Sequence, residues 1–249
     1  MYYIKVLLFS LIYLVSLSAS DFENAENPLN NTVNQEPISS HWCFSYGGVS
    51  DWQKYLNFAG HDLSQFRLAD FNGDGKDDIL YITETGQWYI SYGATSKWKV
   101  VKSLPNVTID QLLFGDFNGD GKDDIFYVTP NHHWCISNGG EGKWQQINSF
   151  ANVSINRYRV ADFNGDGKAD IFYISDRYKW YISYSGTSKW TLVNGFPNAS
   201  IAQMRFADFN ADGKMDVFYV NKNTQWYVSY SATNAWRQIN SYPNVGISQ

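Results

Sequence analysis

A repeat of 46 residues constrains the fold of this chain more than any other feature. The acidic string ADFNGDGKDD contains Asp70, and equivalent aspartates follow at Asp116, Asp162 and Asp208, each 46 residues after the last. The ten tryptophans keep the same step, in two series: Trp42, Trp88, Trp134, Trp180 and Trp226, and ten residues later Trp52, Trp98, Trp144, Trp190 and Trp236. A fixed step of this length indicates one supersecondary unit that recurs and buries its apolar faces against its neighbours.

Each repeat predicts four short strands. In the first complete unit the candidates are FRLADF before the acidic loop, DILYIT after it, then QWYISYG and KWKVVKSL. Apolar and polar residues alternate in these runs, Gly and Thr clusters separate them, and no window holds a helical apolar stripe. Aromatic residues make up 18% of the chain, which also favours strands. The fold class predicted is all-β, a β-propeller of 46-residue four-stranded blades.

The number of blades is less regular than the repeat. Four complete units span residues 66–111, 112–157, 158–203 and 204–249, and residues 41–65 hold only the third and fourth strands of another unit. Three arrangements stay open: a small propeller with an incomplete N-terminal blade, an open arc, or closure by self-association. Unpaired blade edges favour association.

The N-terminal 40 residues differ from the repeats. Lys5 followed by the apolar run 6–17 and the small residues 18–20 predicts a signal peptide over 1–20, with an uncleaved anchor as the alternative. Residues 21–40 are polar and predict a flexible lead-in, and 41–249 form the repeat domain. We therefore expect a secreted protein with no membrane span after cleavage. Cys43 and Cys135 share a repeat position two units apart, so we expect two small buried thiols and no disulfide.

The acidic loop has the residue spacing of a calcium site. Counting from Asp70 as position 1, Asn72 and Asp74 occupy positions 3 and 5, Lys76 offers its carbonyl from position 7, and Asp78 closes the loop at position 9. Calcium takes six to eight oxygen ligands, which alternate residues of a curved loop can supply. The alternatives are an ion-free Asx turn and magnesium, which prefers a stricter octahedron.

The other three loops repeat these ligand types, so we expect one calcium ion in each of four loops. The predicted ligands there are Asp116, Asn118, Asp120, Lys122 and Asp124; Asp162, Asn164, Asp166, Lys168 and Asp170; and Asp208, Asn210, Asp212, Lys214 and Asp216. Position 8 varies and is not expected to be a ligand. Position 4 is Gly except at Ala211, so a positive φ there would make the fourth site the weakest.

The strings DFNGDGKDDI, DFNGDGKADI and DFNADGKMDV resemble FG-GAP repeats, also called VCBS repeats, over residues 41–249. The resemblance is to the cation-binding blades of integrin α-chain propellers and of propeller lectins. It implies that the loop links the first two strands of a blade and that the protein binds an extracellular glycan or protein.

Two further sets of residues are candidate sites. Sequons at Asn30, Asn106, Asn152 and Asn198 predict glycosylation, although Asn also suits a turn. Trp98, Trp144, Trp190 and Trp236 are candidate sugar-stacking residues, with packing between blades as the stronger interpretation.

The remaining residues give no catalytic constellation. The four histidines do not form a recurring feature, and no metalloprotease or serine-hydrolase motif is present. A net charge of −5 argues against nucleic acid as a partner. The function predicted is a non-enzymatic, secreted, calcium-stabilised binding or adhesion module. A purely structural protein–protein scaffold and a non-catalytic part of a secreted enzyme system remain the alternatives.

Overall fold

The computed structural model describes residues 41–44, 53–57, 63–104, 106–150, 153–195 and 199–241, with the backbone alone for 41–44 and 53–57. The expected signal peptide, the lead-in and the sequons at Asn30, Asn152 and Asn198 lie outside these residues, as does the side chain of Cys43. Within the described part, no helix has the length and apolarity needed to cross a membrane.

Four antiparallel sheets of four strands each form the body of the molecule, and we number them blades 1 to 4. Blade 1 contains β3 (Phe66–Ala69), β4 (Asp78–Ile82), β5 (Gln87–Ser91) and β6 (Lys99–Ser103). Blade 2 contains β7 (Leu112–Gly115), β8 (Asp124–Val128), β9 (His133–Ser137) and β10 (Gln145–Ser149). Blade 3 contains β11 (Tyr158–Ala161), β12 (Asp170–Ile174), β13 (Lys179–Ser183) and β14 (Thr191–Gly195). Blade 4 contains β15 (Met204–Ala207), β16 (Asp216–Val220), β17 (Gln225–Ser229) and β18 (Arg237–Ser241).

Short 3-10 turns occupy two fixed places in the repeat. One precedes the first strand of each blade: η3 (Leu63–Gln65), η5 (Ile109–Gln111), η7 (Ile155–Arg157) and η9 (Ile201–Gln203). The other follows the third strand: η4 (Tyr92–Ala94), η6 (Asn138–Gly140), η8 (Tyr184–Gly186) and η10 (Tyr230–Ala232). A separate two-stranded sheet, the N-terminal hairpin, pairs β1 (His41–Phe44) with β2 (Gln53–Asn57).

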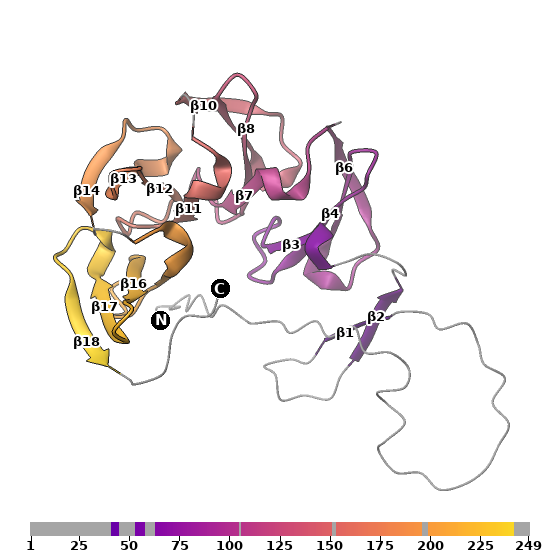
Figure 1. The fold of residues 1–249 in the computed structure, drawn as a ribbon. Helices are drawn as coiled ribbons and strands as arrows, with labels where there is room; N and C mark the ends of the chain where they lie inside the picture. The colour runs from indigo at the N-terminus through magenta and orange to yellow at the C-terminus, as the bar shows by residue number, and fades with distance from the viewer. Residues whose placement is uncertain are drawn as a thin grey trace, which may run out of the picture.

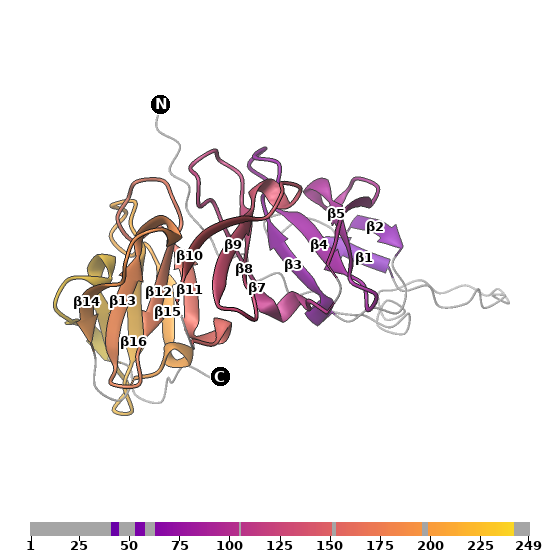
Figure 2. The same ribbon diagram turned by 90° about the horizontal axis from the view of Figure 1, so that it is seen from above.

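The blades follow one another in chain order around an arc (Figure 1). Seen from above, the sheets stand side by side, and the N-terminal hairpin lies beyond blade 1, at the opposite end from blade 4 (Figure 2). The predicted all-β, propeller-like arrangement of four-stranded sheets is confirmed, and the described strands form an open arc.

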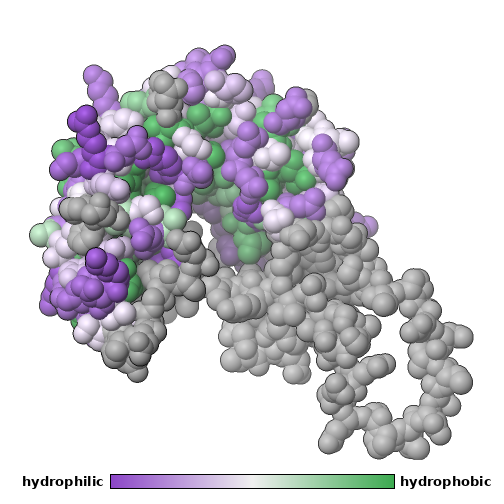
Figure 3. All heavy atoms as spheres, in the orientation of Figure 1, coloured by the Kyte–Doolittle hydropathy of each residue, from purple (hydrophilic) through white to green (hydrophobic). Residues whose placement is uncertain are grey.

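The core lies between consecutive sheets. All five residues of β4 are buried, whereas β18 is exposed along its whole length. Figure 3 shows the same pattern on one face, with hydrophobic residues gathered between the blades and hydrophilic residues on their outer side. A single sheet cannot cover both of its apolar faces, so stacking of blades is what stabilises the repeat.

Candidate metal centre

Each acidic loop connects the first and second strands of a blade. In blade 1, Asp70 follows the last residue of β3, and Asp78 opens β4, where it pairs with Ala69 across the ladder. The ladder therefore fixes both ends of the loop, as the sequence predicted.

The first aspartate of the loop is the acceptor around which the backbone curls. Asp70 Oδ1 accepts hydrogen bonds from the N–H groups of Gly73 at 2.7 Å and Asp74 at 3.2 Å, and Oδ2 accepts one from Gly75 at 2.8 Å. Gly73 and Gly75 have φ angles of +76° and +82°, a conformation that glycine adopts without strain. Asp116 receives the corresponding three bonds in blade 2.

Positions 3 and 5 point their oxygens into the same turn. Asn72 Oδ1 accepts the Asp74 N–H at 2.8 Å, and Asp74 Oδ1 accepts the Lys76 N–H at 2.9 Å. The same two bonds recur in the other three loops, between 2.7 and 3.0 Å. Because the residues at position 5 are exposed, water reaches their carboxylates.

The aspartate at position 9 joins two distant parts of its blade. Asp170 is fully buried; its Oδ2 accepts the Phe163 N–H at 3.0 Å, and its Oδ1 accepts the Ser185 N–H of η8 at 2.8 Å. Equivalent pairs of bonds reach Asp78, Asp124 and Asp216. From the sequence these residues were predicted only as metal ligands. Their second role, as acceptors for a backbone N–H fifteen residues later, could not be predicted, because a backbone donor requires no particular side chain in the sequence.

Burial makes these carboxylates weaker acids. Desolvation is the main cause, and it raises the pKa of Asp124 to about 6 and of Asp170 to about 7, against the lowering effect of the two backbone donors. The pKa values of Asp78 and Asp216 rise for the same reason. Nearby position 1 and position 5 carboxylates add to the shift, so positive charge in the loop would favour the ionised form.

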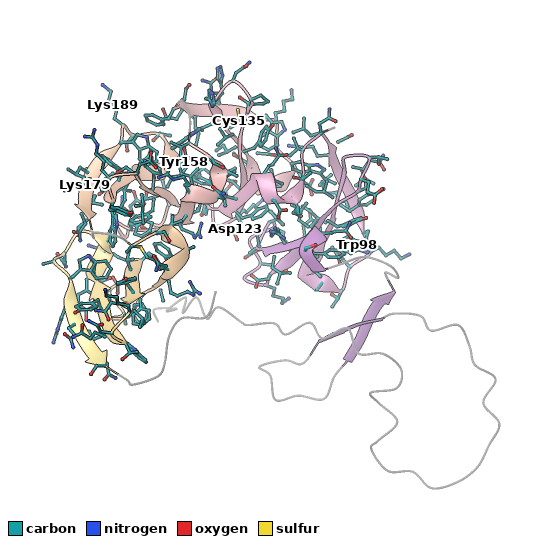
Figure 4. The ribbon with its side chains drawn as sticks, in the orientation of Figure 1. Trp98, Asp123, Cys135, Tyr158, Lys179 and Lys189 are labelled. Carbon is teal, nitrogen blue, oxygen red and sulfur yellow. The ribbon has the colours of Figure 1, made fainter. Side chains whose placement is uncertain are left out.

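Neighbouring loops are hydrogen-bonded to each other. The position 8 N–H of one loop donates to the position 1 carbonyl of the preceding loop, from Asp123 to Asp70, from Ala169 to Asp116 and from Met215 to Asp162, at 2.7 Å each time. The three junctions share this main-chain bond whatever the side chain at position 8, and at the first junction Asp123 Oδ2 also accepts the Asp70 N–H at 2.9 Å. Figure 4 places Asp123 toward the inner side of the arc, where the loops of successive blades meet.

Positions 4 and 7 form a second contact between loops. The Lys76 side chain is 74% exposed. The next three lysines instead lie across the preceding loop: a Cβ on Gly73 would meet Lys122 Cγ at 3.1 Å, and one on Gly119 would meet Lys168 Cε at 3.1 Å. Position 4 has positive φ in all four loops, including +59° at Ala211, which is the condition for a weaker fourth site.

The donor set of each loop fits a hard cation. Every candidate side-chain ligand offers oxygen. An ionised carboxylate has about four lone-pair sites, of which backbone N–H groups take three at Asp70 and two at Asp78. Within the described residues, no three acidic, His or Cys side chains converge closely enough to hold an ion as they stand. The carboxylates instead accept hydrogen bonds from backbone N–H groups.

The second tryptophans lie between blades. Trp144 meets Trp88 of the preceding blade edge to face, with ring centroids 6.0 Å apart, and the pairs Trp190–Trp134 and Trp236–Trp180 are 5.3 and 5.1 Å apart. Trp98 packs near Phe66 and Tyr81 in blade 1. All four keep part of their surface in solvent.

Two further predictions fall on described residues. Asn106 is exposed with φ +67°, which leaves its side chain accessible to modification. Cys135 is a free thiol, as expected, but it is only partly buried, so the expectation of a buried thiol is wrong at this position.

Comparison with solved structures gives similarity at low sequence identity. A chain in the crystal structure of BBS1N in complex with ARL6DN, soaked with lead, has a TM-score of 0.44 and 8% identity over 75% of this chain and 58% of that chain. The structure of YjhT has a TM-score of 0.46 and 11% identity over 77% of this chain and 69% of YjhT. The V. cholerae biofilm matrix protein Bap1 has a TM-score of 0.40 and 16% identity over 74% of this chain and 30% of Bap1. No curated protein matches the sequence.

The model of the FG-GAP-like repeat matches residues 70–127, 116–173 and 162–219. Each match begins at a position 1 aspartate, at Asp70, Asp116 or Asp162, and runs into the second strand of the following blade. Together the matches span well over half of the chain. The chain therefore belongs to the FG-GAP-like repeat family and is organised as a repeat-based interaction module.

Proposed function

We propose that this protein is a secreted calcium-binding propeller repeat protein that acts as a non-enzymatic binding module for an extracellular glycan or protein. One observation supports the calcium sites above all others: four loops repeat the same oxygen-bearing side chains on the same backbone curl, each wound around its position 1 aspartate. When bound, calcium supplies the positive charge that offsets three carboxylates in one loop.

The chain's own residues explain how calcium would serve binding. Position 9 ties each loop to the 3-10 turn after the third strand, and position 8 ties it to the preceding loop. A loop that is fixed by an ion would therefore also fix the 3-10 turn and the loop of the neighbouring blade. Calcium would therefore act by fixing the surface that these turns form.

Calcium binding is tested by titration calorimetry on the wild type and two variants of the first loop. Asp74→Ala removes a predicted ligand and should lower the stoichiometry by one. Asp77→Ala is the matched control, because the third loop naturally carries Ala169 at that position, and it should leave the stoichiometry unchanged. Unchanged stoichiometry in Asp74→Ala would refute the ligand assignment.

A polar hollow between blades 1 and 2 is the place we propose for the ligand. It has a volume of about 250 Å³ and is lined by Phe71, Asn72, Tyr92, Asp120, Lys122, Asn138, Gly139 and Glu141. Glu141 accepts hydrogen bonds from Tyr92 and Lys99, and these partners, Lys99 first, lower its pKa. An aromatic ring beside amide and carboxylate groups suits the hydroxyls and apolar face of a sugar.

A glycan array probed with and without EDTA tests the ligand class. Binding to a defined sugar should depend on calcium and should weaken in Tyr92→Ala. Tyr230→Ala is the control, because Tyr230 holds the same repeat position in blade 4 and does not line this hollow. Binding lost on Trp98→Ala or Trp144→Ala would place the sugar on the tryptophans instead. No binding across the array would favour a protein ligand.

A further inference from the structure

Three of the four first strands carry an arginine that the backbone holds in the same way. Arg67 Nη1 donates to the carbonyls of Ser64 and Phe66, at 2.8 and 2.7 Å. Arg159 and Arg205 donate in the same way to the carbonyls one and three residues before them, at distances between 2.7 and 3.2 Å. Two carbonyls thus hold one nitrogen of each planar guanidinium group, which fixes the orientation of its other N–H donors.

The ion pair of Arg67 shows what this arrangement binds. Arg67 Nη2 donates to a carboxylate oxygen of Asp110, which lies 43 residues later in η5, just before the first strand of blade 2. The Asp110 side chain is 77% exposed, so the pair lies at the surface. A guanidinium group presents its N–H donors in a fork that matches the two oxygens of a carboxylate. The held arginine of blade 1 is therefore paired with a carboxylate that blade 2 supplies.

The corresponding junction between blades 3 and 4 lacks that carboxylate. The residue 43 positions after Arg159 is Ala202 in η9, and it is exposed. Among the described residues Arg159 has no carboxylate partner, and its hydrogen bonds to the two carbonyls use only Nη1. The donor that binds a carboxylate in blade 1 therefore has no acceptor in blade 3 within the part of the chain that the structure describes.

A second positive charge lies close to Arg159. Arg159 is partly buried, and its pKa is lowered, first by desolvation and then by the charge of Arg205 on the first strand of blade 4. Partial burial and a neighbouring like charge both disfavour the charged guanidinium group, and an anion would offset both effects. Because Arg205 and Ala202 are exposed, an anion can reach this place from solvent.

We propose that Arg159 binds the carboxylate of an acidic ligand at the junction between blades 3 and 4, as Arg67 binds the Asp110 carboxylate between blades 1 and 2. Arg159 supplies the oriented N–H donors, and Arg205 adds positive charge. Because two carbonyls already hold the guanidinium group, little conformational freedom is lost on binding. This site lies at a different junction from the polar hollow and does not depend on the calcium or sugar assignments.

The source of the carboxylate is examined with two larger probes. Glucuronate and N-acetyl-glutamate α-amide carry one carboxylate each, on a sugar ring and on a peptide unit. The probe that binds more tightly than acetate identifies the source, and equal affinities mean that the site recognises the carboxylate alone.

NMR titration of the full chain with sodium acetate tests the proposal itself, with sodium chloride exchanged for acetate so that the ionic strength stays constant. The Nε–H signals of Arg67 and Arg159 are assigned by their loss in Arg67→Lys and Arg159→Lys. The Arg159 signal should shift in a saturable way, with half of the change reached at about 1–50 mM acetate. The Arg67 signal should not shift, because Asp110 already pairs with that guanidinium group.

Two variants exchange the carboxylate between the junctions. Ala202→Asp supplies an internal carboxylate at the repeat position of Asp110 and should weaken the acetate response of Arg159 roughly 10-fold or more. Asp110→Ala should give Arg67 the response that Arg159 shows in the wild type. The chain already carries both Asp and Ala at this repeat position, so the fold tolerates either. An Arg159 signal that acetate does not shift, or that shifts equally in Ala202→Asp, would overturn the proposal, and an Arg67 signal that stays unresponsive in Asp110→Ala would count against it.

Discussion

Replacing Asp170 by alanine should destabilise blade 3 whether or not calcium is present. The change leaves the buried N–H of Phe163 and the partly buried N–H of Ser185 without acceptors, at a cost of about 1–3 kcal/mol for each. Removal of a desolvated carboxylate, whose pKa burial raises to about 7, offsets part of that cost. We expect a net loss of about 2–4 kcal/mol. For a chain of this size that corresponds to a melting temperature lower by roughly 5–15 °C.

Asp166→Ala in the same loop is the control, because its carboxylate is exposed and water can replace it as the acceptor of the Lys168 N–H. Thermal unfolding followed by circular dichroism in EDTA should show a loss of less than about 1 kcal/mol for Asp166→Ala. In millimolar calcium both variants should lose stability, since both remove a predicted ligand. Equal melting temperatures for the two variants in EDTA would refute the structural role of position 9.

Three other outcomes are expected. Ala211→Gly should strengthen calcium binding at the fourth loop and raise stability by up to about 1 kcal/mol, because it relieves a φ of +59°; calorimetry and melting curves measure both. Asn194→Ala should cost about 1–3 kcal/mol in urea unfolding, whereas Asn240→Ala, studied below the concentration of any association, should cost nothing measurable. EDTA should lower the melting temperature of the wild type by several degrees, because a ligand of the native state adds stability by mass action; an unchanged melting temperature would contradict calcium binding.

The strands could be predicted because their pattern is local. The runs 66–71, 78–83, 87–93 and 97–104 contain β3, β4, β5 and β6, and the ladder pairs Ala69 with Asp78 at the mouth of the loop. Alternating side chains and a repeat step of fixed length carry that information in the sequence itself.

The contacts between blades could not be predicted in the same way. The donor to Asp170 is a backbone N–H in η8, a turn whose residue Ser185 has φ +50°, although serine rarely adopts this conformation. The exposure of Cys135 also depends on how strands lie at the outer side of a blade, which repeat position alone does not fix (Figure 4). The hydrogen bond to Asp170 and the exposure of Cys135 depend on how the strands and turns pack in three dimensions. The same side chains are compatible with more than one such packing, so the sequence alone does not determine these features.

The acidic loop serves as a turn and as a joint between blades at once, and this explains which of its positions vary. Where the joint uses the main chain, as at position 8, the chain carries Asp123, Ala169 and Met215 in turn without losing the 2.7 Å bond. Where the joint leaves no room for a side chain, as at position 4, Gly73, Gly119 and Gly165 lie against the lysine of the following loop, and alanine occurs at Ala211 in blade 4.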